Sequence, residues 1–306
     1  MRAATTDIPA MPDRPRRPLL GIALVLLFCT LAPVGDAAAK LLGSRVPLVE
    51  VLLVRFAMTL VLLPFVREGA RDIVASPRLL RLTALRSALH VVATATFFLA
   101  LRHLELADAV AIAFAMPFVL LLLGRFFGGE EAGPRRIVAC VIGFAGTLLV
   151  VQPSFATVGP PALLPLAVAV LFALFMLVTR QLAMATDAVA LQAVGGALLV
   201  PVLLAAFVLA ALAGWVEPAL PRATDAALLL AVGAIGIFAH LTMTWGLAHV
   251  SASTAAPIQY VEIPVATLVG WLVFGDWPDG PAALGIAIII AAGLTIIALE
   301  RRAAAR

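Results

Sequence analysis

The chain has 306 residues, of which 63% are hydrophobic and 12% are charged, and its mean hydropathy is +1.13. This composition excludes a soluble globular protein of such length and indicates a polytopic membrane protein. The formal charge of +4 does not point to nucleic acid, because no basic run is interleaved with aromatic residues and the chain has a single Tyr. Both cysteines lie inside apolar runs, so neither a disulfide framework nor a metal cluster is supported.

Residues 1–18 hold four prolines and several arginines, a composition typical of a disordered basic leader, which we expect on the cytoplasmic side. The apolar run at 19–39 follows directly. Its basic flank and its three terminal alanines are also compatible with a cleaved signal peptide, but many further spans with no exported soluble domain favour a membrane helix. Residues 301–306 are expected to form a cytoplasmic tail.

Nine more apolar runs are long enough to cross a hydrocarbon core about 30 Å thick. Together with the first run, they predict an all-α polytopic membrane protein with ten transmembrane helices. The nine runs lie near 47–66, 79–101, 105–127, 134–152, 160–180, 188–214, 225–247, 251–274 and 281–299.

The distribution of basic residues predicts the orientation, because cytoplasmic loops carry an excess of Lys and Arg. With the N-terminus inside, 15 of the 21 Lys and Arg residues fall on the cytoplasmic side, four fall on the other side, and Arg55 and Arg86 stay in the membrane. An odd number of spans would break this pattern. We therefore expect a multi-pass protein of the cell membrane, specifically a bacterial inner membrane, with both termini cytoplasmic.

Several residues recur at a nearly constant interval, which indicates an internal duplication. The pairs are His103–His249, Gly129–Gly275 and Glu130–Asp276 at 146 residues, and Pro117–Pro264, Pro134–Pro281 and Gly146–Gly293 at 147 residues. The repeated unit contains five spans, and an odd number of spans inverts the second copy relative to the first. We therefore predict two inverted five-helix repeats, at 19–153 and 160–300. Chance matches between apolar runs are the alternative.

Three stretches resemble the EamA family of the drug/metabolite transporter superfamily: PFVLLLLGRFFGGE at 117–130, EIPVATLVGWLVFGDWPD at 262–279 and GFAGTLLVVQP at 143–153. The resemblance covers nearly the whole chain beyond residue 18. It implies a ten-span carrier of small polar metabolites, such as amino acids and their derivatives, S-adenosylmethionine or riboflavin, with a substrate cavity between the two halves. The chain departs from the family pattern at Asp276, where Glu is more usual.

Glu262 lies at the middle of the predicted span 251–274, where a carboxylate costs at least about 2.5 kcal/mol unless it faces protein or water. Pro257 and Pro264 free backbone carbonyls near it, which membrane helices tolerate where they line a cavity. We predict that Glu262 contacts substrate and is the candidate for proton coupling. One small and polar helical face contains this residue, and its members are Ser251, Ala255, Gln259, Glu262, Ala266 and Gly270.

Arg55 near the centre of the second span, and Arg86 and His90 on one stripe of the third, place basic groups in the membrane as well. With Glu262 they predict contacts to a zwitterionic or mixed-charge solute. Stacking and hydrogen bonds are expected from the remaining predicted substrate-binding residues, which are His240, Gln259 and Tyr260. The alternative is structural, with Arg55 pairing with Glu262, or Arg86 with a backbone carbonyl, to hold helices together.

Three further acidic residues lie near the outer ends of their predicted helices, and we expect structural roles for them. Asp36 is spaced i, i+4 from Lys40, so these two side chains are predicted to pair. Asp108 is compatible with an interfacial group or a gate, and we favour a structural role for it and for Glu50.

Catalytic and nucleotide-binding signatures such as GxxxxGK[ST], HExxH and Gly-x-Ser-x-Gly are absent from the sequence. The sequence therefore predicts a secondary-active transmembrane transporter of small polar organic metabolites that works by alternating access. The alternatives are a membrane-embedded enzyme that acts on a lipid-linked substrate, with Glu262 and His90 as acid and base, and a membrane scaffold. We expect no catalytic residue, cofactor or metal. The expected partners are a small-molecule substrate and the lipid bilayer, not nucleic acid, and a homodimer stays open.

Overall fold

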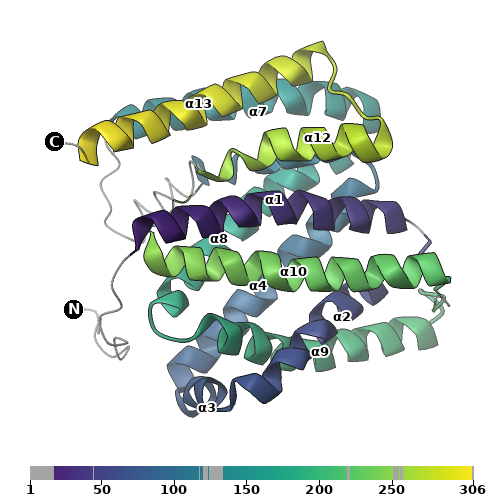
Figure 1. Cartoon of the computed structure of the whole chain (residues 1–306). Helices are drawn as coiled ribbons and strands as arrows, with labels where there is room; N and C mark the ends of the chain where they lie inside the picture. The colour runs from purple at the N-terminus through teal and green to yellow at the C-terminus, as the bar shows by residue number, and fades with distance from the viewer. Residues whose placement is uncertain are drawn as a thin grey trace, which may run out of the picture.

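Most of the long helices in the computed structural model run side by side and form one bundle (Figure 1). The structure describes residues 17–43, 45–116, 118–119, 123, 134–218, 221–250, 255 and 258–304. Within these ranges helices are the only regular elements, in agreement with the predicted all-α class. Residues 1–16 of the predicted leader, Pro257 near Glu262 and Pro117 of the predicted repeat lie outside the described part.

Helices follow one another with short connections along the whole described chain. Up to residue 116 the elements are α1 (Pro18–Leu42), α2 (Leu48–Ala57), the 3-10 helix η1 (Met58–Phe65), α3 (Arg67–Ala75), α4 (Pro77–Leu101) and α5 (Leu106–Ala113). From residue 134 they are α7 (Pro134–Val158), the 3-10 helix η2 (Pro160–Leu163), α8 (Leu164–Ala183), α9 (Ala188–Leu212), α10 (Ala223–His249), α12 (Glu262–Phe274) and α13 (Gly280–Ala304). In Figure 1, α1 begins and α13 ends at the same end of the bundle.

Seven helices of the described part are long and apolar enough to cross a membrane, which makes this a multi-pass membrane protein. They are Pro18–Leu42, Leu48–Phe65, Pro77–Leu101, Val141–Val158, Pro160–Ala183, Ala188–Leu212 and Ala223–His249, and they coincide with seven of the predicted spans. The predicted spans 105–127 and 251–274 include residues outside the described part, and the span at 281–299 lies within α13, whose stretch Gly280–Ala292 is apolar. The total of ten therefore stays a prediction.

Helix ends follow from local chemistry. α1 and α4 begin with Pro18 and Pro77. The first N–H groups of a helix have no intrahelical partner, so a proline there costs no hydrogen bond. The Ser76 hydroxyl accepts a hydrogen bond from the Leu79 N–H at 3.4 Å, and the Asp187 carboxylate caps α9 in the same way. These capping interactions start helices at the short loops predicted from the sequence.

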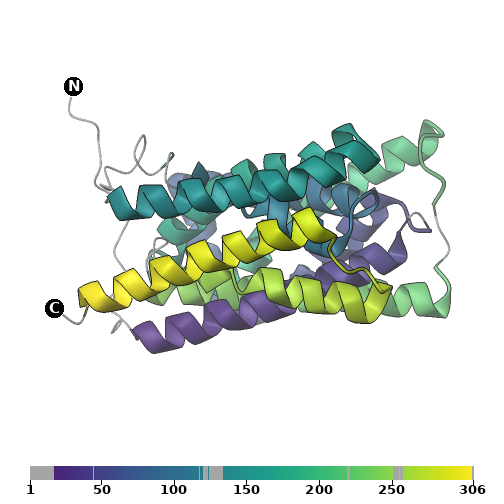
Figure 2. The same ribbon diagram turned by 90° about the horizontal axis from the view of Figure 1, so that it is seen from above.

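Glycines allow the closest helix crossings. A Cβ on Gly285 of α13 would lie 2.6 Å from the carbonyl oxygen of Gly146 on α7, so this crossing has no room for a side chain. A Cβ on Gly246 of α10 would lie 3.2 Å from the carbonyl oxygen of Gly21 on α1. Small residues let backbones approach in this way, and α7 accordingly lies along α13 and α1 along α10 (Figures 1 and 2).

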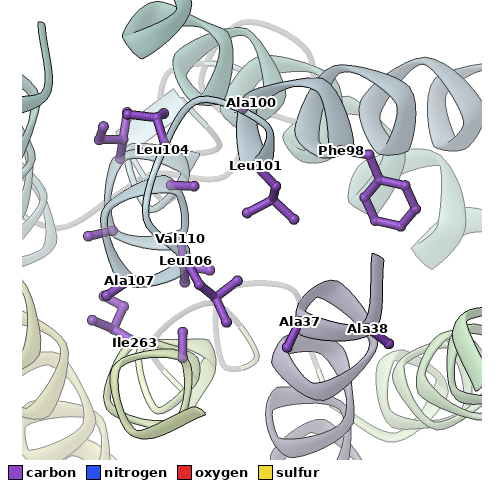
Figure 3. Packing of buried hydrophobic residues seen from close by; sticks show 14 of the residues in the cluster. Ala37, Ala38, Phe98, Ala100, Leu101, Leu104, Leu106, Ala107, Val110 and Ile263 are labelled. Carbon is purple, nitrogen blue, oxygen red and sulfur yellow. The ribbon is translucent and has the colours of Figure 1, made fainter. Parts of the chain in front are cut away.

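A buried apolar cluster joins α1, α4, α5 and α12, and Figure 3 shows its centre. Ala37 and Ala38 of α1 lie opposite Leu101 of α4, and Leu106 of α5 lies above Ile263 of α12. All of these residues are buried. This packing positions the four helices around the polar site described below.

The predicted span 251–274 is not one continuous helix in its described part, which corrects our expectation. A turn at Tyr260 and Val261 interrupts it, and α12 begins only at Glu262. Pro264 explains the break, because it has no N–H to donate to the carbonyl of Tyr260 one turn earlier. Glu262 therefore lies in the first turn of a helix and not at the middle of one. Within the described part of the predicted small face, Glu262 is half-buried and the other positions, Ala255, Gln259, Ala266 and Gly270, are buried.

Candidate functional site

A cavity of about 100 Å³ lies among α1, α2, α4, α5, α8, α10 and the start of α12. Most of its wall is apolar and includes the rings of Phe28, Phe97, Phe98, Phe114 and Phe172. Its polar side chains are Asp36, Arg55, Thr94, His240, Gln259 and Glu262. Few polar groups on an apolar wall are typical of a site that binds a small organic molecule.

The structure brings four of the seven predicted binding residues to this cavity and leaves three elsewhere. Those on the wall are Arg55, His240, Gln259 and Glu262, whereas Arg86, His90 and Tyr260 are not part of it. Asp36 is on the wall as well, although the sequence pattern assigned it a structural pairing.

Arg55 of α2 reaches the cavity because α10 makes room for it. Its side chain is buried, and its guanidinium lies 5.3 Å from the centre of the Phe98 ring, within reach of a cation–π interaction. A Cβ on Gly236 would lie 2.9 Å from Arg55 Cζ, so glycine at this position of α10 leaves the space that the guanidinium occupies.

Asp36 of α1 faces the cavity because its predicted partner is engaged elsewhere. Lys40 Nζ lies 3.0 Å from Asp276 Oδ2 and 4.6 Å from the centre of the Phe274 ring, so the predicted Asp36–Lys40 pair does not form. Asp36 instead lies close enough to Arg55 for their charges to interact. A sequence signal was available, since Phe28, Ala32 and Asp36 recur every four residues on one face of α1 and all three line the cavity.

Glu262 stands at the N-terminus of α12, where unpaired backbone N–H groups carry partial positive charge. Within the described residues it makes no ion pair with Arg55, so the structural alternative of an Arg55–Glu262 pair is not realised. Its charged neighbour is another acid, Asp36. The cavity thus holds two carboxyl groups and one guanidinium.

His240 of α10 pairs with His90 of α4 behind the cavity wall. The two Nε2 atoms are 2.9 Å apart, so one of them donates a hydrogen to the other, and the ring centres are 3.9 Å apart. The second nitrogen of His240, Nδ1, is buried and has no hydrogen-bond partner among the described residues, and the same holds for Gln259 Oε1. Buried polar atoms are nearly always paired, so these two cavity residues have capacity for a ligand.

Arg86 does not reach the cavity and instead connects four helices. It donates from Nε to Thr179 Oγ1 at 3.0 Å, and from Nη2 to Gln192 Oε1 and Thr244 Oγ1 at 3.4 Å each. Its guanidinium also lies 4.9 Å from the centre of the Phe175 ring. These contacts favour the structural alternative for Arg86. Its hydrogen-bond partners are side chains of other helices, whereas the sequence suggested a backbone carbonyl.

Tyr260 packs beside the cavity at the helix break. Its ring centre lies 5.4 Å from that of Phe114, which occupies the corresponding turn after α5. A Cβ on Gly143 of α7 would lie 3.3 Å from its hydroxyl oxygen. The ring therefore supports the wall that Phe114 lines.

Clusters of His, Cys, Asp and Glu with the geometry of a metal site do not occur among the described residues. Charges of both signs and two buried hydrogen-bonding atoms without a partner among the described residues meet on this largely apolar wall.

Comparisons with known proteins extend over nearly the full chain. The S-adenosylmethionine uptake transporter of Rickettsia felis is 26% identical over 97% of this chain and 98% of its own length. The riboflavin transporter of Rhizobium johnstonii is 31% identical over 64% of this chain and 63% of its own, and the pseudopaline exporter of Pseudomonas aeruginosa is 26% identical over 92% and 96%. A solved crystal structure has the same fold, with a TM-score of 0.63 at 19% identity over 95% of this chain and 99% of that one.

The sequence model of the EamA-like transporter family matches the chain twice, at residues 19–152 and 160–298. These two matches cover nearly everything beyond the predicted leader and agree with the resemblance carried by the three sequence stretches. The chain belongs to the EamA-like transporter family.

Proposed function

We propose that the protein is a secondary-active transporter that moves small polar organic metabolites across the membrane by alternating access. The observation that carries this proposal is the cavity, whose wall brings Asp36, Arg55 and Glu262 together inside a bundle of membrane-spanning helices. Ionisable groups inside a membrane are costly, and they commonly mark the path of a substrate or ion.

Relatives support the substrate class. Their names state that they take up S-adenosylmethionine, transport riboflavin or export pseudopaline. These small organic solutes differ from one another, so at such identities the class transfers to this chain and the individual solute does not. Because the relatives are named as transporters, they also favour a carrier over a membrane-embedded enzyme.

Corresponding elements support two inverted five-helix repeats at 19–153 and 160–300. The family matches the chain twice, and α7 and α13 begin at Pro134 and Gly280, 146 residues apart. Phe114 and Tyr260, at the turns after α5 and before α12, are also 146 residues apart and pack ring to ring. Inverted-repeat carriers place such interrupted helices around a site near the middle of the membrane.

Helix pairing agrees with the same relation. α1 lies along α10, and α4 lies along α8. α1 and α8 begin 146 residues apart and are equivalent in the two repeats, and the same holds for α4 and α10. Exchanging the two halves of the chain therefore turns the α1–α10 pair into the α8–α4 pair. With the arginine bias, this arrangement favours an inner-membrane carrier whose termini both lie in the cytoplasm.

The size of the cavity fits a contracted state of a carrier. At about 100 Å³ it is smaller than the roughly 300–1,000 Å³ of typical ligand sites. A metabolite such as those named above requires the surrounding helices to move apart, which alternating access provides. The breaks at Phe114 and Tyr260 are natural places for that movement.

The test of this proposal is transport by the purified protein in liposomes. We expect protein-dependent movement of at least one of S-adenosylmethionine, methionine, S-methylmethionine or riboflavin, recovered chemically unchanged on the far side of the bilayer. Recovery of a chemically altered solute would indicate an enzyme. Absence of movement for all of them would contradict a carrier of this class.

Coupling to protons is proposed for Glu262, because a carboxyl without a basic partner can hold either a proton or a cationic group of the solute. Glu262→Gln keeps the shape and hydrogen-bonding reach of the side chain but cannot titrate. We expect this variant to lose accumulation driven by a pH gradient while retaining exchange of solute between liposome interior and exterior. Continued accumulation would show that the proton is carried elsewhere.

A further inference from the structure

We propose that the cavity selects solutes with one more positive than negative charge, namely organic cations that also carry a carboxylate. This inference rests on the proposed transport function and deepens it by naming the charge class of the substrate. In the bound state, the carboxylate of the solute lies on Arg55, and its two cationic centres lie beside Asp36 and Glu262.

Fixed charges on the cavity wall are unbalanced. Asp36 and Arg55 interact and offset each other, and among the described residues Glu262 makes no ion pair with a basic side chain. Its charged neighbour, Asp36, repels a second negative charge. An unpaired carboxylate in such a place is expensive, so a cation that enters the cavity gains a strong electrostatic partner.

Other basic residues in the described structure do not correct this imbalance. Arg86 is absent from the wall, and its guanidinium is engaged by Thr179, Gln192 and Thr244. Lys40 is bound to Asp276 at 3.0 Å and is not part of the wall either. Among the described residues, the wall therefore holds no basic side chain besides Arg55 and His240, and a cationic solute or a proton can supply the charge that offsets Glu262.

Two unpaired buried atoms point independently to a hydrogen-bonding ligand. Gln259 Oε1 and His240 Nδ1 have no partner among the described residues, although their side chains are only 1% and 6% exposed and both line the cavity. Gln259 precedes Glu262 across the turn at Tyr260 and Val261, and both line the cavity. An ammonium group can donate hydrogen bonds to Gln259 Oε1 and to the Glu262 carboxylate together.

Aromatic rings on the wall suit a cation of low hydration. Phe28, Phe97 and Phe172 present apolar surface to the cavity beside the two acids. Ring faces attract ammonium and sulfonium centres, and methyl groups on such a centre reduce the cost of removing it from water. A zwitterion with a single cationic centre would leave one of the two acids, Asp36 or Glu262, without a positive partner.

Matched probes isolate this charge. S-adenosylmethionine and S-adenosylhomocysteine differ by one methyl group and one positive charge, and S-methylmethionine and methionine differ in the same way. We expect the cationic member of each pair to bind the purified full-length protein in lipid nanodiscs at least about tenfold tighter than its neutral partner. Riboflavin serves as an uncharged probe without a carboxylate.

Variants assign the preference to residues. Glu262→Gln should bring the affinities of the two members of each pair together, and Asp36→Asn should weaken the cationic member more than the neutral one. Arg55→Gln should weaken both members similarly, because both carry the carboxylate. Glu217→Gln, at an exposed acid outside the cavity, is the matched control and should leave all affinities unchanged.

Wild-type affinities decide the inference even if a variant fails to fold. Equal or tighter binding of the neutral members would overturn it, and so would Asp36→Asn and Glu262→Gln proteins that fold but keep the full preference. If either result overturns the inference but the liposomes still transport the neutral members or riboflavin, the proposed carrier function stands. Failure of all five probes to bind and to move in liposomes would overturn both the inference and the proposed function.

Discussion

At the scale of single residues, the position of Arg55 depends on an absent side chain in α10. The guanidinium fills the space beside Gly236, and a Cβ there would lie 2.9 Å from Arg55 Cζ. The position of the Arg55 guanidinium, to which we assign carboxylate binding, thus depends on packing against α10 as well as on α2 itself.

Gly236→Ala should therefore displace Arg55 and slow transport. Overpacking of this kind costs about 1–3 kcal/mol, which is small enough for the protein to remain in the membrane. Initial transport rates, normalised to protein abundance, provide the measurement. Gly280→Ala, where nothing lies within 4 Å of the added carbon, is the matched control and should behave as wild type.

The histidine pair links the cavity wall to the helix behind it. His90→Ala leaves His240 Nε2 without its 2.9 Å partner and opens space beside the Phe56 and Phe175 rings. We expect several-fold slower transport and a modest loss of thermal stability, about 1–3 kcal/mol for an unsatisfied buried group. His103→Ala, at an exposed histidine, is the control and should change neither the transport rate nor the stability. Normal transport by His90→Ala would show that the histidine pair is not needed for transport.

At the scale of elements, an ion pair joins α1 to the loop after α12 at the end of the bundle away from Pro18. Lys40 and Asp276 are 3.0 Å apart and partly exposed, with side-chain exposures of 17% and 23%. Pairs of this kind contribute about 0–1 kcal/mol, so a transport cycle can break and remake the contact. This suits a closure at one end of the cavity.

Lys40→Ala should weaken that closure. We expect a cysteine introduced at Ala32 on the cavity wall to react faster with a membrane-impermeant thiol reagent when Lys40 is removed. Exchanging the two residues, with Lys40→Asp and Asp276→Lys together, should restore slow labelling because it restores the pair. Unchanged labelling in Lys40→Ala would show that the contact does not close the cavity.

At the scale of the whole molecule, the two halves of the chain have opposite orientations in the proposed topology. Cysteines at Arg78 and Trp277, both exposed and neither capping a helix, should then be labelled from opposite sides of the membrane in a background without native cysteines. The Arg78 position should react only after the inner side is made accessible. Labelling of both from one side would contradict the inverted repeat.

Much of the molecule follows from local properties of the sequence. Hydropathy predicted the membrane class and the seven spans that the structure describes, because about twenty apolar residues per helix is a requirement of the bilayer itself. Pro257 and Pro264 indicated freed backbone carbonyls near Glu262, but the break before α12 was not predicted. The intramembrane charges were also evident as a set, since each is unusual in an apolar run.

Only the tertiary structure decided which of those charges share a cavity. Asp36 turns to the cavity because Lys40 binds Asp276, which is 236 residues away. Arg86 is held outside it by partners on α8, α9 and α10, at separations of 93, 106 and 158 residues. Spacing along one helix places a side chain on a face, but the contacts that this face makes depend on close packing between helices distant in the chain.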